Sequence, residues 1–258
     1  MADAAGKRLI ETRHDDGLVI VQLDRPPANT LTADFLDEID AAFKRLDSDT
    51  GARAVVLKGY EKVFSGGMDL KALPSFDRDT QRAVVDGLNH CYGTLYRFSK
   101  PLVAAATGHA IAGGLFFILA ADFRIGGEGR ALFGLAEVRV GVAFPVAPIE
   151  IARAELTPAM ARRLLLTGQP VTIDEARAGG IFDEVVAPDQ VEARAIEKAR
   201  EMARSPAEAY AAIKRQLRGA VIAKIGRAVE NLDDPLRVEW FTSETVSYTH
   251  LTLPTSKP

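Results

Sequence analysis

The chain has 258 residues, of which 47% are hydrophobic and 26% are charged, the composition of an ordinary soluble globular protein with a sizeable core. A formal net charge of −3 predicts no basic surface for nucleic acid, and a single cysteine, Cys91, excludes an intramolecular disulfide. The N-terminus lacks an apolar signal region and no apolar run is long enough to span a membrane, so we expect no membrane association and favour the cytoplasm.

The first part of the chain reads as strands alternating with helices. Residues 18–23 form the first predicted strand, because they are a β-branched run after a turn-like Asp-Asp-Gly. A loop over 24–29 follows, and Thr32 can cap the next helix. The apolar residues of that helix recur at helical spacing and comprise Phe35, Leu36, Ile39, Phe43 and Leu46. Residues 54–58 then predict a second short strand.

The stretch 63–71, Val-Phe-Ser-Gly-Gly-Met-Asp-Leu-Lys, predicts a strand that runs into a glycine-rich turn and opens a helix. Ser65 does not fit a hydrolase nucleophile, because the nucleophile elbow needs Gly-x-Ser-x-Gly and Val63 stands where the first glycine should be. The phosphate-binding string Gly-x-x-x-x-Gly-Lys-Ser/Thr does not occur in the sequence either. Neither of these two glycine-rich motifs therefore explains the turn.

The stretch 100–126 repeats the pattern of strand, small-residue turn and helix. A buried strand at 102–106 leads through small residues to an apolar helix that we expect to begin near Gly113. The first N–H groups of a helix have no partner within it, so such a start can receive an oxyanion or a phosphate; alternatively, its glycines only permit tight packing. Taken with the earlier turn, the backbone N–H groups of Met68 and Gly113 predict an oxyanion hole.

From the first strand to about Glu244, the sequence resembles the crotonase (enoyl-CoA hydratase/isomerase) superfamily. Several blocks in family-like order and spacing carry the resemblance. These blocks are Leu23-Asp24-Arg25-Pro26 with Ala28-Asn29, Phe64 to Lys71, Lys100-Pro101 with Gly108, Ala112-Gly113-Gly114, Ala121-Asp122, Phe133-Gly134 with Glu137 and Gly141, and Ala176 with Gly179 to Val186.

The resemblance implies an α/β fold, a crotonase-type spiral of ββα units with a C-terminal helical region, assembled into homotrimers or hexamers. It implies an acyl-CoA substrate whose thioester carbonyl accepts hydrogen bonds from the N–H groups of Met68 and Gly113. Coenzyme A would enter as part of the substrate, with no separately bound cofactor. The residues that the resemblance places at the substrate are Arg25, Ala28, Met68, Asp69, Leu70, Lys71, Gly113 and Phe116.

The acid/base residues separate the activities within this resemblance. Family hydratases use two glutamates, and in this chain the first of these positions holds Phe116 while the second holds Glu137. Hydration needs a water that is both held and polarised, whereas moving a double bond from the 3 to the 2 position needs only one base. The sequence therefore favours a Δ3-Δ2-enoyl-CoA isomerase with Glu137 as its catalytic base.

Other activities stay open alongside the isomerase. Among enzymes, hydratase comes next and then thioester hydrolase or decarboxylase. A non-catalytic relative that binds acyl-CoA or associates with RNA is the alternative of another class, and the acidic composition argues against RNA.

Other chemistry-bearing residues are expected to be structural. We predict that Cys91 is a buried core thiol, that His109 is hydrogen-bonded, and that Asp122 ends or turns the helix that starts at Gly113. No His, Cys, Asp or Glu cluster has the spacing of metal ligands, so we predict no metal site.

The remainder of the chain is expected to be mainly helical. An amphipathic helix is predicted at 158–167, a helix capped at Thr172 or Asp174 comes next, and a short strand is expected over 181–186. Further helices are predicted after Gln190 and from Pro206 to about Lys224. An apolar stripe in this part predicts contacts between subunits and contains Ile196, Ala199, Met202 and Ala203.

These patterns divide the chain into three regions. Residues 1–190 are predicted to form the core with the acyl-CoA site, and residues 191–245 a helical oligomerisation region. The tail 246–258, Val-Ser-Tyr-Thr-His-Leu-Thr-Leu-Pro-Thr-Ser-Lys-Pro, has no helical stripe and reads as a non-native sequence.

Overall fold

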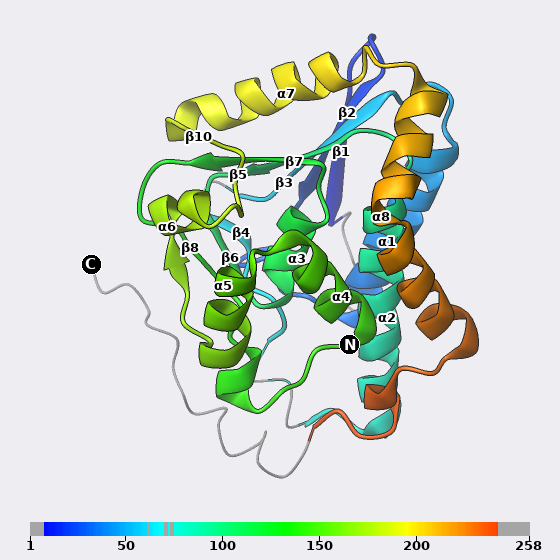
Figure 1. Ribbon diagram of the computed structural model, residues 1–258, viewed down its shortest axis with the longest axis vertical. Helices are drawn as coiled ribbons and strands as arrows, with labels where there is room; N and C mark the ends of the chain where they lie inside the picture. The colour runs from blue at the N-terminus through cyan, green and yellow to red at the C-terminus, as the bar shows by residue number, and fades with distance from the viewer. Residues whose placement is uncertain (1–7, 61, 70–71, 73–74, 242–258) are drawn as a thin grey trace.

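The computed structural model describes residues 8–60, 62–69, 72 and 75–241, and its backbone is built around two sheets (Figure 1). The larger sheet has 6 strands, in the order β1 (Leu9–Arg13), β2 (Leu18–Leu23), β3 (Ala54–Lys58), β5 (Leu102–Ala106), β7 (Phe123–Gly127) and β10 (Glu184–Val186). The smaller sheet has 4 strands, in the order β4 (Val63–Ser65), β6 (His109–Ile111), β8 (Leu132–Gly134) and β9 (Val171–Thr172).

Successive units of the chain alternate between the two sheets. The strands β3, β5 and β7 pair in parallel in the larger sheet, while the strands that follow them, β4, β6 and β8, pair in parallel in the smaller one. A helix follows each of the first two pairs, α2 (Arg78–Arg97) after β4 and α3 (Gly113–Leu119) after β6. The predicted α/β spiral of ββα units is confirmed.

The remaining helices cover the sheets and extend toward the end of the described chain. They are α1 (Ala33–Ser48), α4 (Val146–Glu155), α5 (Pro158–Ala161), α6 (Ile173–Ala178), α7 (Val191–Met202) and α8 (Ala207–Asn231), with 3₁₀ turns η2 (Glu137–Val140), η4 (Pro188–Gln190) and η5 (Pro235–Arg237) and a π-helical turn η3 (Arg162–Leu166). In Figure 1, α7 lies across one side of the larger sheet and α8 runs beside α2. Within the described residues, no helix is both long and apolar enough to cross a bilayer.

The larger sheet is buried on both faces, which explains why its central strands are apolar throughout. On one face, Val103, Ala105 and Ile125 pack with Ala195 and Ala199 of α7. The other face belongs to the main core, which α1, α2 and α3 complete. All five residues of α3 after its first glycine pair have buried apolar side chains, so this short helix lies inside the protein rather than on its surface.

Several sequence predictions need correction. The strand at 18–23 is not the first, because β1 precedes it and pairs with it in antiparallel register. Only one residue of β1 is buried, so the sequence of β1 carries no clear strand pattern. No helix begins at Met68 among the described residues, since Met68 forms an isolated bridge with Leu31. The strand predicted at 181–186 is limited to β10.

The predicted C-terminal helices are present with different bounds. The segment 158–167 divides into α5 and η3 instead of forming one regular helix, and α8 continues to Asn231 rather than ending near Lys224. Of the two predicted caps, Thr172 and Asp174, Thr172 caps α6 with a capping box, in which Glu175 returns a hydrogen bond.

Asp122 follows α3 and fixes the position of α8. Its side chain accepts hydrogen bonds from the Leu102 N–H at 2.8 Å, the Tyr210 hydroxyl at 2.9 Å and the Lys214 ammonium at 2.7 Å. The guanidinium of Arg218 lies 3.2 Å from its second oxygen, and both cations are only 6% exposed. The predicted structural role of Asp122 is confirmed.

Replacing Asp122 with Asn tests this buried charge cluster. Asp122→Asn keeps the shape but leaves Lys214 and Arg218 without their shared counter-charge, so we expect a loss of ~3–5 kcal/mol in the free energy of unfolding. Urea unfolding measures it, with the exposed Asp174→Asn as a control that should cost less than ~1 kcal/mol. Equal effects of the two substitutions would contradict the assignment.

Candidate active site

Two turns of the backbone touch at the edge of the smaller sheet, one after β4 and one after β6. A Cβ on Gly114 would lie 2.2 Å from the Ser65 carbonyl oxygen, and a Cβ on Gly67 would lie 2.8 Å from the Ala112 Cβ and 3.2 Å from the Gly113 nitrogen. Such distances are too short for any side chain. Glycines at these positions therefore allow the two backbones to come into direct contact.

The Met68 and Gly113 N–H groups lie on these two turns. Met68 pairs with Leu31 in an isolated parallel β-bridge. A hydrogen bond from the Leu31 N–H to the carbonyl of Gly67, the residue before Met68, contributes to this bridge at 2.9 Å. Gly113 is the first residue of α3, where an N–H has no intrahelical acceptor. Across the described ranges, no group accepts a hydrogen bond from either N–H. Both donors are thus free to bind a ligand, and their convergence on one point stays a prediction.

The residue before Gly113 has an unusual backbone conformation. Ala112 has φ 52° and ψ −131°, a region that residues with a side chain rarely occupy. Conformations of this kind cost about 1–3 kcal/mol each and persist only where the surroundings hold them. Here the Ala112 N–H donates to the Gly134 carbonyl of β8 at 2.7 Å. The peptide that carries the Gly113 N–H is therefore held in a strained turn.

The loop with Arg25 and Ala28 packs against the first of the two turns. The Gly66 N–H donates to the Ala28 carbonyl at 2.9 Å, and the fully buried Asn29 donates from Nδ2 to the Phe64 carbonyl at 2.9 Å. The Arg25 guanidinium donates to the Thr30 carbonyl at 2.7 Å. The structure thus places Arg25 and Ala28 beside the turn that leads to Met68.

The other predicted binding residues are placed only in part. Asp69 is exposed and follows Met68 directly. Leu70 and Lys71 lie outside the described residues. The structure therefore neither places nor excludes their side chains as contacts for coenzyme A.

Glu137 is a buried carboxyl group at the start of η2, on the segment that follows β8. Glu137 is only 8% exposed, and no described group forms a hydrogen bond with its Oε2. Burial raises the pKa of Glu137 to about 8, and a hydrogen bond from its own backbone opposes this only weakly. A buried acid without a charged partner, titrating near neutral pH, is suited to proton transfer.

An aromatic cluster links the two candidate elements. Phe116 of α3 is buried, with its ring 5.5 Å from that of Tyr92 and 5.9 Å from that of Phe144. The Tyr92 hydroxyl donates to the Gly113 carbonyl at 2.6 Å. Burial, followed by the nearby Cys91 and Glu137, raises the pKa of Tyr92 well above its ordinary value. Tyr92 therefore contacts Gly113 and lies within electrostatic reach of Glu137.

Tyr92 is the site residue that the sequence analysis missed. It lies on α2, far along the chain from both glycine turns, and reads there as one member of an apolar stripe. A usable signal did exist, because a tyrosine in a buried stripe needs a hydrogen-bond partner for its hydroxyl.

The segment after α8 fixes the loop that carries Phe144. Asp234 accepts hydrogen bonds from the Val146 N–H at 2.7 Å and from the Asn89 amide at 2.8 Å. The Trp240 indole donates to the Ala143 carbonyl at 2.8 Å. Both ends of the loop around Phe144 are therefore bonded to the last described residues of the chain.

The residues predicted to be structural have that role here. Ser65 is buried and donates to the Asn29 carbonyl, and His109 accepts a hydrogen bond at Nδ1 from the Leu132 N–H. Cys91 is a free, buried thiol whose pKa burial raises well above its ordinary value. No group of His, Cys, Asp or Glu within the described residues could hold a metal ion.

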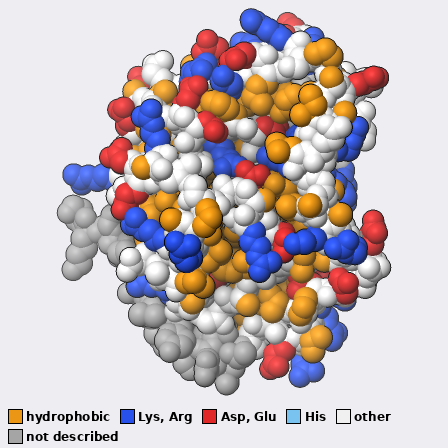
Figure 2. Space-filling view, in the orientation of Figure 1, with side chains coloured by type: hydrophobic (Ala, Val, Ile, Leu, Met, Phe, Trp, Pro, Cys, Tyr) orange, Lys and Arg blue, Asp and Glu red, His pale blue; other side chains and the backbone are white. Residues whose placement is uncertain are grey.

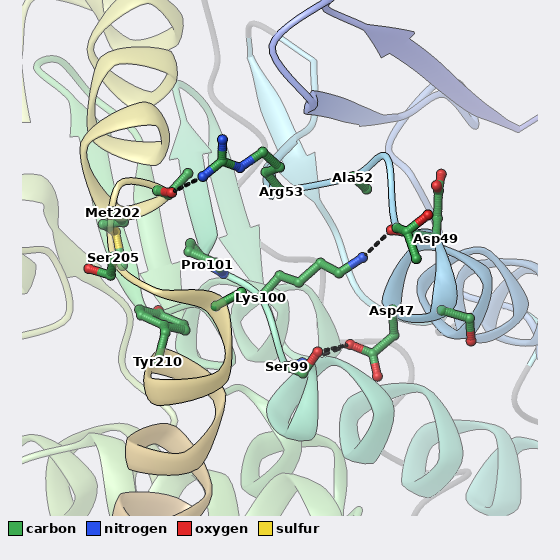
Figure 3. Close-up of a pocket in the computed structure, with 14 residues that line it drawn as sticks. Asp47, Asp49, Ala52, Arg53, Ser99, Lys100, Pro101, Met202, Ser205 and Tyr210 are labelled. Atoms are coloured by element: carbon green, nitrogen blue, oxygen red, sulfur yellow. Dashed lines mark hydrogen bonds between the residues drawn. The ribbon is translucent and has the colours of Figure 1, made fainter.

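A hollow of about 380 Å³ lies where the end of α1 meets the start of β5 and the α7–α8 connection (Figure 3). Lys100 crosses it and donates to the Leu46 and Asp49 carbonyls, which end α1. Arg53 donates to the Ala203 carbonyl, and Ser99 donates to Asp47. Lys100 and Arg53 therefore already have acceptors for their charged groups. Lys100, one of the residues that carried the family resemblance, connects the end of α1 to the start of β5.

Comparison with known proteins matches residues 13–247 to the family described as enoyl-CoA hydratase/isomerase. The chain is 33% identical over 204 residues to the probable enoyl-CoA hydratase EchA17 of Mycobacterium tuberculosis, covering 78% of this chain and 76% of that protein. The solved structure of the probable enoyl-CoA hydratase EchA3 of the same species is similar, with TM-score 0.81, 30% identity, and coverage of 88% of this chain and 94% of that one. The human mitochondrial Δ3-Δ2-enoyl-CoA isomerase has TM-score 0.81 and 26% identity, covering 95% of this chain and 93% of its own.

The buried carboxyl group gives a prediction about stability that does not depend on substrate. The unfolded chain releases the Glu137 proton above its ordinary pKa of 4.5, whereas the folded protein keeps it up to about pH 8. The stability that the buried, protonated carboxyl group contributes is fully present below pH 4.5 and is lost as the pH rises through 8, by ~1.4 kcal/mol per pH unit. Glu137→Gln has no proton to release, so it should gain stability over the unmodified protein between pH 5 and pH 8.

Urea unfolding of both proteins at pH 5 and pH 8 measures this effect. Glu128→Gln, at an exposed position, is the matched control and should show no such difference. The assignment fails if Glu137→Gln and the unmodified protein lose stability in parallel over this range.

Proposed function

The chain belongs to the crotonase (enoyl-CoA hydratase/isomerase) superfamily, and we propose that within it the protein is a Δ3-Δ2-enoyl-CoA isomerase. The observation that carries the proposal is Glu137, a buried carboxyl group without a charged partner, beside an aromatic cluster that holds Phe116. One carboxyl group suffices to move a proton between two carbons of the same acyl chain.

In the proposed complex, the thioester oxygen accepts hydrogen bonds from the Met68 and Gly113 N–H groups. Removing a proton from C2 places negative charge on that oxygen, so donors fixed there in advance stabilise the dienolate more than the ground state. The loop around Arg25 and Ala28, with Asp69, Leu70 and Lys71, would hold the coenzyme A portion. Arg25 supports this role, because the other N–H groups of its guanidinium have no acceptor among the described residues.

Glu137 would carry the proton from C2 to C4. Its carboxylate takes the C2 proton, the double-bond electrons shift toward C2–C3, and the resulting carboxylic acid returns the proton to C4. A pKa of about 8 makes the carboxylate a stronger base than an exposed glutamate, which helps it to remove a proton from carbon. The same burial stabilises the neutral acid that must keep the proton during transfer.

Enoyl-CoA hydratase is the second candidate, and the name of the mycobacterial relative favours it. Hydration adds water across the double bond and, in the family pattern, uses a second carboxyl group. Phe116 occupies that position and packs against Tyr92 and Phe144, which favours a dry site over a held water. These aromatic contacts therefore support the isomerase over the hydratase.

The apolar stripe predicted to make contacts between subunits, Ile196, Ala199, Met202 and Ala203, packs instead against the larger sheet of the same chain. We propose that the protein self-associates through another C-terminal helix, α8. Two large apolar residues one turn apart on α8, Ile213 and Leu217, are 63% and 82% exposed. Apolar side chains also gather over the lower centre of the face in Figure 2. Exposed apolar faces of this kind support contact with another protein surface, here a second copy of the chain.

Substitution of Glu137 tests the reaction. Glu137→Gln keeps the shape of the side chain but cannot act as a base, so we expect isomerisation of 3-enoyl-CoA to fall by roughly 10²–10⁴-fold. Affinity for a saturated acyl-CoA, measured by titration calorimetry, should change little, and Glu128→Gln should leave the rate unaltered. Substantial hydration of 2-enoyl-CoA by the unmodified protein, together with an unaffected Glu137→Gln variant, would rule out the single-glutamate isomerase.

Substitution of Phe116 tests why hydration is disfavoured. Phe116→Glu introduces the carboxyl group of the two-glutamate pattern and should raise hydration of 2-enoyl-CoA by up to roughly 10²-fold, since a positioned acid/base group contributes on this scale. Phe116→Leu, which removes the ring without adding a carboxyl group, is the control. The explanation is wrong if both substitutions raise hydration equally.

The self-association proposal has its own test. Ile213→Glu with Leu217→Glu places charges on the exposed stripe of α8, so a trimer or hexamer seen by light scattering should dissociate toward smaller species. Arg215→Glu, exposed on another side of the same helix, should leave the assembly intact. An unmodified protein that is monomeric at micromolar concentration would contradict the proposal.

A further inference from the structure

The hydroxyl of Tyr92 makes a contact that packing alone does not require. Tyr92 is fully buried on α2 and donates to the Gly113 carbonyl oxygen at 2.6 Å. The approach is close enough that a Cβ on Gly113 would lie 3.0 Å from the hydroxyl oxygen and 2.6 Å from Leu31 Cδ1. The first residue of α3 is therefore enclosed between a tyrosine hydroxyl and a leucine.

Two hydrogen bonds bracket the peptide group that carries the Gly113 N–H. On the side before it, the Ala112 N–H donates to the Gly134 carbonyl at 2.7 Å. On the side after it, the Gly113 carbonyl accepts from Tyr92. The peptide group between them is held as well, because its own carbonyl, that of Ala112, accepts from the Leu115 N–H at 3.0 Å. The direction of the Gly113 N–H therefore depends on the whole bonded turn, and the Tyr92 hydroxyl holds the side after it. With φ 52° at Ala112, this turn persists only while such contacts hold it.

The ring of Tyr92 adds a second restraint on the same turn. Its centroid lies 5.5 Å from that of Phe116 and 5.1 Å from that of Phe117, both in the first turns of α3. The ring thus sets the distance between α2 and α3, and the hydroxyl sets the rotation of the first α3 residue. These two effects can be separated, because phenylalanine retains the ring and removes the hydroxyl.

We propose that Tyr92 is a positioning residue that aims the Gly113 N–H at the thioester oxygen of the substrate. The inference rests on the proposed oxyanion site but applies to any reaction of this family that passes through a thioester enolate. A tyrosine that only satisfied its own hydroxyl would contribute to stability and leave the rate unchanged. A positioning tyrosine affects the rate in addition.

Tyr96 provides the matched control for this test. It lies one turn further along α2, is equally buried, and donates its hydroxyl to Glu155 at 2.7 Å, within the charge cluster around Arg218. Tyr92→Phe and Tyr96→Phe each remove one buried hydroxyl and its hydrogen bond from the same helix. Their effects on thermal unfolding should be similar, while their effects on the reaction should differ.

For Tyr92→Phe we expect kcat to fall about 10- to 100-fold with little change in KM. A misdirected Gly113 N–H weakens its hydrogen bond to the thioester oxygen mainly in the transition state, when that oxygen carries negative charge. Tyr96→Phe should keep both constants. The rate is measured with 3-enoyl-CoA and with 2-enoyl-CoA, so that the variants are compared on whichever reaction the unmodified protein performs. Unchanged kcat in Tyr92→Phe would overturn the inference.

Infrared difference spectra of bound butyryl-CoA, labelled with ¹³C at the thioester carbonyl, supply a readout that needs no turnover. The unmodified protein and Tyr96→Phe should lower the carbonyl frequency relative to free ligand, and Tyr92→Phe should reduce that shift. A full shift in Tyr92→Phe would overturn the positioning role and leave the proposed function standing. Absence of a shift in the unmodified protein would overturn the oxyanion site and the inference together. A reduced shift in Tyr92→Phe, with no isomerisation by any of the proteins, would support the positioning role and reject the isomerase.

Discussion

Contact between two backbone turns, without side chains between them, is the constraint on which the candidate site depends. Ser65 and Gly114 meet through backbone atoms, and Gly67 touches Ala112 and Gly113. The close approach results from the spiral, because β4 and β6 are parallel neighbours and their following turns meet at the same end. Larger residues at either glycine would force the two turns apart, so the fold and the site share one requirement.

Several features of the site lower the stability of the folded chain. Ala112 occupies a strained conformation, and Glu137 is buried with an oxygen that no described group bonds. The Ala112 turn is held by the bond from its N–H to the Gly134 carbonyl, and Leu31 lies against the next residue, Gly113. A strained residue and an unpaired buried carboxyl oxygen near one another are typical of functional sites.

The sequence predicted the elements whose signals are local. The strand at 54–58 and the start of α3 at Gly113 are confirmed, and one of the two predicted caps of α6, Thr172, is the observed one, because each depends on neighbouring residues. The strand β1 and the packing of Tyr92 against α3 depend on partners far along the chain, which no local pattern specifies. Resemblance to a family, rather than periodicity, identified Glu137; its burial and raised pKa emerge only in three dimensions.

The bonds from Asp234 to Val146 and from Trp240 to Ala143 join residues 88 and 97 positions apart. During synthesis on a ribosome, the chain through α4 is complete long before these partners have been made. The loop bearing Phe144 therefore cannot reach its final place until nearly the whole described chain has left the exit tunnel. The central strands of the larger sheet can form early in synthesis, while the aromatic cluster of Tyr92, Phe116 and Phe144 is completed last.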